Sequence, residues 1–588
     1  MIRQKNLERL KPLFIGGMFI VFFIYFGTFK KYHILFLEQK QLFQYNLNHF
    51  SDLISLPGGL SAYIGSFFTQ FFVSSWLGAL IFTITAFTVF ILTKYIYKIH
   101  KIDNIILASV PVWLLAILLN NESFAFSQAI GFLFALSFFA LYISIDTREL
   151  RYFLYFTGWP ILYVVASRYS LPVIFLCILH EVLYRKETNV LTITALYIAT
   201  GVLTIYVLIE YIFYIPSDKI FAYPFLPDLQ SLSRYAMLLL LAWYPLLLLI
   251  SYPLKRKNVF NYKFLPWNTG NIVAGTLVFT LMAVIGFRYS YNKRIELMKR
   301  IDHYAQKADW KKVLKASDRY PDYNTLVIYY TNLALYKTGQ LSDRMFRYPQ
   351  IGAEGLSLSP DRNVNSFYGG DVYYHLAYTN EAYRWAFESM VQDGLNPRSL
   401  KRLAITSIIN GDNKIAGKFL HQLQQTLFYR EWANHYTEVL ADSSLAKTDP
   451  LISHNRDLLV HTDFFKIANN LNLIDLLNNH PDNKMAYEYF MASLLLEKNL
   501  EGFVRFVQRM RDYGYTKIPV HFEEALLFYN SYRNINFVPE GFSFSPQTIS
   551  KFNDYSSIYL KNINNPPAAA KELQKKYGGT YWFYLQFV

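Results

Sequence analysis

The sequence lacks most of the features that mark a soluble enzyme or a disulfide-stapled secreted protein. Among 588 residues there is one cysteine, Cys177, so no intramolecular disulfide can form. The CxxC, HExxH, GxGxxG, GxxxxGK[ST] and GxSxG motifs are all missing. Zinc-protease, dinucleotide, P-loop and nucleophile-elbow chemistry are therefore not indicated. Any catalysis has to come from a site within or beside a membrane.

Charged residues are also scarce, at 17% of the chain, against 53% hydrophobic and 18% aromatic residues. The formal charge of +15 does not point to nucleic acid, because the lysines and arginines collect in short connections between apolar runs. Membrane topology explains that placement. We therefore expect a membrane protein without a nucleic-acid partner.

Long apolar runs fill the first half of the chain. A membrane span needs about 20 mostly apolar residues, and by that measure we expect about nine spans in residues 1–288. Their expected starts lie near Leu13, Trp76, Asn104, Ala129, Tyr152, Leu171, Val190, Arg234 and Thr269. Lysine and arginine favour alternate connections, which predicts a cytoplasmic N-terminus and an outward-facing second half. The expected location is a bacterial inner (cytoplasmic) membrane, with residues 289–588 in the periplasm.

Residues 289–588 have frequent charges and apolar residues at helical spacing. The stretches 301–341, 380–425 and 485–514 each predict paired amphipathic helices with small and aromatic residues interleaved. This spacing is typical of tetratricopeptide (TPR) repeats in a degenerate form. The expected fold class is therefore all-α: a polytopic helix bundle followed by a TPR-like solenoid. A solenoid of this kind binds proteins or peptides on its concave face; an irregular helical domain with no groove in use is the alternative.

The connection between the first two spans, residues 30–75, is too polar to cross a membrane and too apolar for a soluble loop. Before Pro57 its apolar residues are spaced as in a helix lying along the bilayer surface. Glu38 and Asp52 are its acids, and Pro57-Gly58-Gly59 interrupts it. Residues 60–72 predict a second short helix.

This plan resembles the GT-C superfamily of membrane glycosyltransferases, in which the first outward loop carries a catalytic acid and membrane-parallel helices. The chain also resembles an uncharacterised family of bacterial multipass proteins through an EQ…PGGL…TQFF…WLGAL pattern, from Glu38-Gln39 to Trp76–Leu80. The GT-C resemblance implies a glycosyltransferase or oligosaccharyltransferase, which transfers sugar from a polyprenyl-phosphate-linked donor to an outward-facing acceptor that could be a protein. The chain departs from the superfamily in one respect, because the common Asp-Glu or Asp-Asp pair is absent.

The GT-C resemblance assigns roles to particular residues. Glu38 would be the general base, with Asp52 as its substitute. Arg168 would hold the donor phosphate. Further substrate contacts are expected from Lys219, Arg234, Glu210, Tyr63 and Gln70, and a divalent cation (Mg or Mn) could involve Glu122.

Each of these residues also has a structural interpretation. Glu38 could lie on the polar face of an interfacial helix, Asp52 could end that helix, and Arg168 could extend to the lipid headgroups. His180 and Glu181 lie at a cytoplasmic helix end, where topology alone accounts for them. Two other functions therefore stay open: a non-catalytic membrane-anchored scaffold of the cell envelope, and a transporter or flippase.

Overall fold

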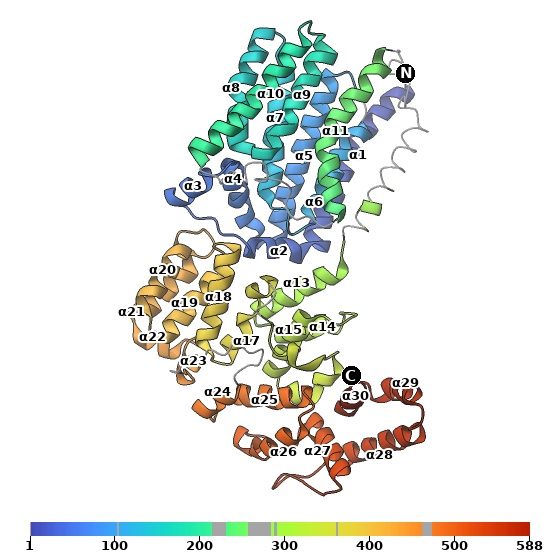
Figure 1. Ribbon diagram of the computed structural model, residues 1–588, viewed down its shortest axis with the longest axis vertical. Coiled ribbons are helices and arrows are strands. Elements are labelled where there is room, and N and C mark those ends of the chain that lie inside the picture. Colours follow the sequence, from blue (N-terminus) through green and yellow to red (C-terminus); the bar gives the residue numbers. More distant parts are fainter. Residues whose placement is uncertain are drawn as a thin grey trace. The chain divides into compact units, whose positions relative to one another are not determined.

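The computed structural model describes residues 2–102, 105–213, 231–256, 281, 284–286, 288, 291–359, 363–460 and 473–588, and within these ranges the chain is helical, with no strand. Two compact units are present (Figure 1). The first, here called the membrane unit, comprises Met1–Lys293 with Gln425–Phe428. The second, the helical unit, comprises Arg294–Gln424 and Tyr429–Val588. The change in composition that we placed after residue 288 falls close to this division.

The membrane unit is a bundle of apolar helices. Among the described residues, five helical stretches are long and apolar enough to cross a membrane, or six if the bent pair Ile15–Phe29 and Lys31–Gln39 is one span. The five are Ser75–Ile99, Phe126–Ser144, the stretch Arg148–Arg185 counted as one, Val190–Phe213 and Ser233–Pro253. Their starts lie within a few residues of the predicted ones, whereas the span expected from Thr269 falls mostly outside the described residues. The bundle helices are α1 (Ile2–Ile24), α5 (Ser75–Ile99), α6 (Ile105–Leu119), α7 (Phe126–Ser144), α8 (Arg148–Ala166), α9 (Leu171–Leu179), α10 (Val190–Leu208) and α11 (Ser231–Arg256).

The helical stretch from Arg148 to Arg185 folds back on itself. The indole Nε1 of Trp159 donates to the carbonyl of Ser170 at 3.0 Å, two positions that a straight helix would hold about 16 Å apart. The reversal occurs at Ser167, whose φ of 49° breaks the helix. Helices α8 and α9 are therefore the two limbs of a hairpin, joined by the turn η3 (Ser167–Ser170).

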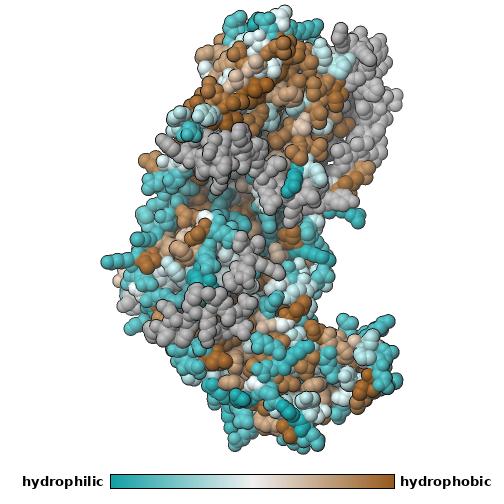
Figure 2. Space-filling view, viewed as in Figure 1, coloured by the Kyte–Doolittle hydropathy of each residue, from teal (hydrophilic) through white to brown (hydrophobic). Residues whose placement is uncertain are grey.

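Exposed apolar side chains mark the outside of this bundle. Figure 2 shows hydrophobic residues over much of the visible face of the membrane unit. On α5, Ile84 and Ile91 are about half exposed, as are Val202 and Leu203 on α10. Soluble monomers seldom expose many large apolar side chains side by side, so these half-exposed residues are consistent with a membrane protein.

The connection after the first span folds into short helices. The π-helical turn η1 (Tyr25–Phe29) leads into α2 (Lys31–Gln39), which is bent by 68° from the preceding helix. Helices α3 (Leu47–Ile54) and α4 (Gly59–Thr69) and the turn η2 (Gln70–Val73) follow. Where we expected one amphipathic helix before Pro57, the structure has two, because Asn46 begins a new helix by accepting a hydrogen bond from the His49 N–H at 2.6 Å.

The helical unit is a series of short helices that pack on their chain neighbours, in particular α14 on α15, α18 on α19, α19 on α20 and α25 on α26. The helices are α13 (Lys293–Gln306), α14 (Trp310–Ser317), α15 (Thr325–Lys337), α16 (Leu341–Arg344), α17 (Gly370–His375), α18 (Thr379–Asp393), α19 (Pro397–Asn410), α20 (Asn413–Gln424), α21 (Arg430–Ala441), α22 (Ser443–Thr448), α23 (Ser453–Asp457), α24 (Leu473–Asn479), α25 (Lys484–Leu496), α26 (Leu500–Val507), α27 (Val520–Arg533), α28 (Pro546–Lys561), α29 (Pro566–Tyr577) and α30 (Tyr581–Phe587).

One helix-ending turn recurs through this unit. A residue in the left-handed region ends the helix, and the next N–H bonds the carbonyl five residues back, which is the Schellman motif. The left-handed residues are Ala308, Gly339, Ala377, Gly411, Lys498, Gly514 and Asn534. The corresponding hydrogen bonds are Asp309 to Tyr304 (2.9 Å), Gln340 to Leu335 (2.7 Å), Tyr378 to Tyr373 (2.9 Å), Asp412 to Ser407 (2.9 Å), Asn499 to Leu494 (2.8 Å), Tyr515 to Met510 (3.3 Å) and Ile535 to Asn530 (3.0 Å). Among the described residues of this unit, the same turn thus separates successive helices at seven places.

Candidate functional site

The loop helices α2, α3 and α4 pack against the ends of the bundle helices. Helix α2 packs on η2 and α5, α3 packs on α4, and α4 packs on α7 and α8. The His33 Nε2 lies 2.9 Å from the carbonyl oxygen of Leu119, to which it donates, so α2 is also tied to the end of α6. The segment 31–73 is therefore a packed part of the membrane unit.

Glu38, the expected general base, lies in the last turn of α2. Glu38 is only 4% exposed, and the side-chain amide of Gln39 donates a hydrogen bond to its carboxylate. Asp52, the expected substitute, lies on α3 and is exposed. Burial lowers the pKa of the nearby His49, while the charge of Asp52 acts in the opposite direction. The two acids thus stand on different helices and in different surroundings.

The Pro57-Gly58-Gly59 break docks on the turn that carries Arg168. The N–H of Gly58 donates to the carbonyl of Val164 at 2.8 Å, and the Ser61 hydroxyl donates to the carbonyl of Val165 at 2.6 Å. A Cβ on Gly58 would stand 3.1 Å from the Cβ of Ser167, and the φ of Gly58 is +81°. A glycine is therefore required here, both by the backbone conformation and by the close approach.

Arg168 is partly buried, and its guanidinium lies 5.5 Å over the ring of Tyr169. It follows Ser167, the residue on which Gly58 rests. The structure therefore brings the expected phosphate-binding arginine next to the loop that carries the expected acids, although Glu38 and Asp52 themselves contact neither it nor each other through any described hydrogen bond.

Tyr63 and Gln70 lie within an aromatic cluster on α4 and η2. The ring centroid of Tyr63 is 5.1 Å from that of Phe43 and 5.0 Å from that of Phe50. The hydroxyl of Tyr45 donates to the side-chain oxygen of Gln70 at 3.2 Å. These contacts hold the irregular segment 40–46 against α4, so both residues have a structural part in the loop.

The other expected site residues lie elsewhere. Glu122 is exposed in the turn between α6 and α7, and Arg234 is exposed on α11. A hydrogen bond of 3.0 Å from Asn121 to Ser233 joins these two segments. Glu210 is exposed after α10, and Lys219 lies outside the described residues. Among the described residues no group of three or more His, Cys, Asp or Glu side chains could hold a metal ion.

A buried ion pair that the sequence analysis missed lies near the C-terminal end of α5, away from the loop helices. Helix α5 has 25 residues and is therefore about 37 Å long. The guanidinium of Arg151 bonds both carboxylate oxygens of Glu181, at 2.7 and 3.0 Å. Tyr142 donates to the same carboxylate at 2.6 Å and lies 2.8 Å from the hydroxyl of Tyr197. Both charged residues are at most 2% exposed. The pair closes the open end of the α8–α9 hairpin, so topology alone does not explain Glu181.

Two histidines extend this network in one direction. His100 Nδ1 lies 2.8 Å from the carbonyl of Ile96, which can only accept, so Nδ1 carries the hydrogen. In neutral His100 the Nε2 then accepts from His180 Nδ1 at 3.2 Å. This leaves His180 Nε2 to accept from Arg185 Nε at 3.4 Å.

The sequence did contain a signal for the pair of Arg151 and Glu181. An arginine near the start of one apolar run and an acid near the end of the next run meet if the two runs form a hairpin.

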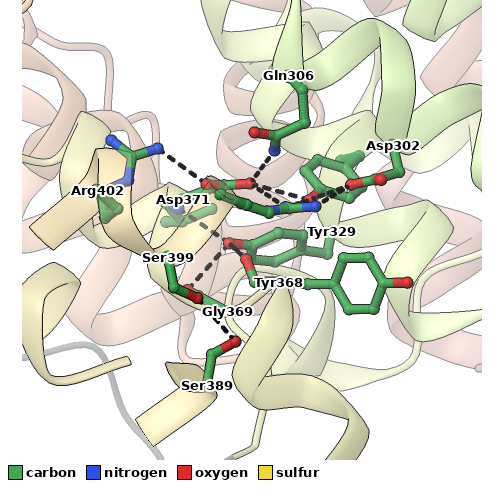
Figure 3. Close-up of polar contacts among 12 residues, drawn as sticks. Asp302, Gln306, Tyr329, Tyr368, Gly369, Asp371, Ser389, Ser399 and Arg402 are labelled. Atoms are coloured by element: carbon green, nitrogen blue, oxygen red, sulfur yellow. Dashed lines mark hydrogen bonds and ion pairs between the residues drawn. The ribbon is translucent and has the colours of Figure 1, made fainter. Parts of the chain in front are cut away.

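The helical unit contains a second buried network, shown in Figure 3. Arg398 on α19 donates to Asp302 and to Asp371, both at 2.8 Å. The Tyr330 hydroxyl lies 3.0 and 2.9 Å from these two carboxylates and can donate to one at a time. Gln306 donates to Asp371 at 2.8 Å. The network therefore links α13, α15, α17 and α19.

The two acids of this network differ. Burial would raise the pKa of Asp371, but the charges of Arg398 and Arg402 outweigh burial and lower it to about 2. For Asp302, burial prevails over the charge of Arg398 and its pKa is raised. Since every described charge in the network has a partner, its arrangement is that of a structural ion-pair cluster.

A family model described as a family of unknown function, DUF6057, matches residues 5–588. Neither the curated proteins nor the solved structures contain a match. The matched range covers both units, including the loop helices and the network of Figure 3. The resemblance to a multipass family without an assigned activity is thus confirmed at that level. The chain belongs to the DUF6057 family.

Proposed function

We propose that this protein is a membrane glycosyltransferase of the GT-C type, which transfers a sugar from a polyprenyl-phosphate-linked donor to an acceptor on the outer face of the membrane. One observation carries the proposal. The loop after the first span is a packed helical segment whose Pro-Gly-Gly break rests on the turn that bears Arg168. An acid-bearing loop and an arginine at one end of a bundle are the parts that such a reaction needs.

The chemistry divides between two kinds of side chain. A lipid-linked phosphate is already a good leaving group, so the protein has to take a proton from the acceptor hydroxyl and hold the departing phosphate. We assign the first task to the carboxylate of Glu38, or to Asp52 if the acceptor approaches along α3. The second falls to Arg168, whose guanidinium can bind two phosphate oxygens at once.

The proposal includes a topology. About nine spans would place the N-terminus in the cytoplasm, and the helical unit in the periplasm of a bacterial inner membrane. The helical unit would then be a TPR-like array that receives a protein or peptide acceptor. The recurrent Schellman turns support this part, because they join consecutive helices in the same way at seven places in the described part of the unit.

The experiment measures the donor, since neither the sugar nor the acceptor has to be known in advance. In a deletion strain that carries the wild-type chain or a variant, polyprenyl-linked sugars in the membrane are quantified by mass spectrometry. Strains that carry Glu38→Gln or Arg168→Gln should accumulate a lipid-linked sugar that the wild-type strain consumes. For Glu38→Gln, which removes the base, the amount of that lipid should rise at least tenfold. Glu149→Gln changes an exposed acid on α8 and serves as the matched control.

The result that counts against the proposal is equally direct. If Glu38→Gln, Asp52→Asn and Arg168→Gln all restore the wild-type lipid profile at equal protein levels, no transferase works at this loop.

A second candidate, a non-catalytic envelope scaffold, is favoured by the same recurrent turns, because helix-hairpin arrays are partner-binding architectures. It predicts that the loop variants keep the function of the chain, whereas truncation after residue 293 abolishes it.

A further inference from the structure

The first turn of α4 lacks partners that a helix N-terminus normally finds. Its N-cap residue is Gly58, which has no side chain to cap the helix. The N–H of Gly59 donates to the Leu56 carbonyl at 3.0 Å, but the N–H groups of Leu60 and Ser61 have no hydrogen-bond partner in the described part of the chain. Unpartnered N–H groups at this end of a helix, together with the positive pole of the helix dipole, attract anions.

Ser167 lies against this helix end and carries a hydroxyl without a partner. The residue is 5% exposed, and its Oγ forms no hydrogen bond to any described residue. Its side chain faces the N-cap of α4, since a Cβ on Gly58 would stand 3.1 Å from the Cβ of Ser167. A buried polar group without a partner is unfavourable, and native structures keep few of them. The hydroxyl is thus available to a ligand at the start of α4.

The backbone of Ser167 is unfavourable as well. Its φ of 49° and ψ of −124° form a combination that glycine adopts readily and other residues seldom adopt. Serine therefore carries two costs at this position, one in the backbone and one in the hydroxyl, and glycine would remove both. Strained residues gather at functional sites. Arg168, the residue assigned to the donor phosphate, follows directly in the chain.

We propose that the N-terminus of α4, the hydroxyl of Ser167 and the guanidinium of Arg168 form one binding site for the phosphate group of a membrane lipid. The N–H groups of Leu60 and Ser61 bind one phosphate oxygen. Arg168 binds another through a charge-assisted hydrogen bond, and the Ser167 hydroxyl reaches the anion by rotation about χ1. Leu60 and Arg168 are each partly exposed, so the anion can approach from the surface. This inference rests on the proposed function, since it specifies how the donor phosphate is held.

Amide hydrogen–deuterium exchange of the full chain in detergent micelles tests the site. The probes are farnesyl phosphate, inorganic phosphate and farnesol, which has the same tail without the phosphate. Farnesyl phosphate should slow exchange at Leu60 and Ser61, because their N–H groups gain a partner, and farnesol should not. Half-saturation at a lower concentration of farnesyl phosphate than of inorganic phosphate supports a lipid ligand, whereas equal concentrations would overturn the lipid assignment. Equal protection by farnesol would overturn the site.

Substitutions of Ser167 separate binding from stability. Ser167→Ala removes the unpartnered hydroxyl, and Ser167→Gly also relieves the backbone, so both variants should be at least as stable as the wild type. Both should nevertheless raise the half-saturating concentration of farnesyl phosphate several-fold. Arg168→Gln should raise it about tenfold or more, since a charge-assisted hydrogen bond is lost. An unchanged concentration in both Ser167 variants would overturn the site.

Ser66→Ala is the matched control. The hydroxyl of Ser66 donates to the carbonyl of Tyr63 within α4 at 3.0 Å, so this serine already has its partner. The variant should bind farnesyl phosphate as the wild type does.

Failure of the site and failure of the transferase function are distinguishable. If farnesyl phosphate binds as expected while the Glu38 and Arg168 variants keep the wild-type lipid profile, the site holds a lipid phosphate and the transferase is excluded. If those variants accumulate the donor while Ser167→Ala neither accumulates it nor binds farnesyl phosphate more weakly, the transferase stands and this site is overturned.

Discussion

Replacement of Arg398 by methionine is the sharpest test of the network in the helical unit. Methionine keeps much of the aliphatic volume but removes the charge, so two buried carboxylates lose their shared partner. The side chains of Arg398 and Asp302 are each 8% exposed, so water cannot replace the lost partner. Breaking a buried ion pair from one side costs about 3–5 kcal/mol. The loss of contact with the rings of Phe367 and Tyr368, at 4.7 and 5.1 Å, adds to this cost.

The assay is amide exchange of the full chain in detergent, under conditions where exchange follows the opening equilibrium. A loss of 3–5 kcal/mol corresponds to about 150- to 5,000-fold faster exchange, since 1.36 kcal/mol is a factor of ten. The amides to watch are those of Tyr329 and Tyr330 on α15, which are fully buried and sit among the helices that Arg398 ties together.

Arg384→Met is the matched control, because Arg384 also pairs with two carboxylates, Glu381 and Glu388, but is 32% exposed. Exposed pairs at this spacing contribute about 0.3–0.5 kcal/mol each, so exchange should accelerate less than about fivefold. Adding Asp302→Asn to Arg398→Met should recover part of the loss, since it removes one uncompensated charge. Equal acceleration by Arg398→Met and Arg384→Met, or no recovery in the double variant, would refute the reasoning.

Three further predictions concern single positions. Asp371→Asn should lower stability at pH 5 and much less near pH 2.5, as measured by amide exchange or thermal unfolding. The folded-state pKa of Asp371, about 2, lies below its unfolded value. The stability that Asp371 contributes is therefore present above the unfolded pKa and is lost as the pH falls toward 2. Ala308→Gly should stabilise the α13–α14 turn by about 0.5–1 kcal/mol and slow amide exchange there, because φ is +52° at an exposed alanine. Ala316→Gly, inside α14, is the control and should lower stability by a similar amount. Slower exchange in Ala316→Gly but not in Ala308→Gly would contradict the prediction. Gly65→Ala should force α4 away from α7, since its Cβ would meet the backbone of Ser127, and should speed chymotryptic cleavage within residues 40–73, whereas Gly417→Ala, with open space around it, should not.

Local patterns sufficed for the helical class and for the positions of the apolar helices, because period and length are written in consecutive residues. The break at Pro57-Gly58-Gly59 was also predictable, and the docking of Gly58 on Ser167 gives it a physical reason. The second helix start at Asn46 was missed, since a single capping side chain decides it.

The buried networks could not be predicted from local patterns. Arg151 meets Glu181 only because α8 and α9 form a hairpin. Asp371 meets Asp302 and Arg398 from three distant segments, and nothing in the sequence around Gly370 distinguishes that aspartate from an exposed one. Such contacts depend on how helices pack, which no single stretch of residues records.

The histidine pair beside the α8–α9 hairpin restricts what can stand at its positions. His180 has to receive a hydrogen from Arg185 on one side and give one to His100 on the other. Glutamine can do both, whereas lysine only gives and glutamate only receives. Replacements there should therefore be sorted by the polarity of their hydrogen bonding before their size, with glutamine tolerated and lysine or glutamate separating the hairpin from the end of α5.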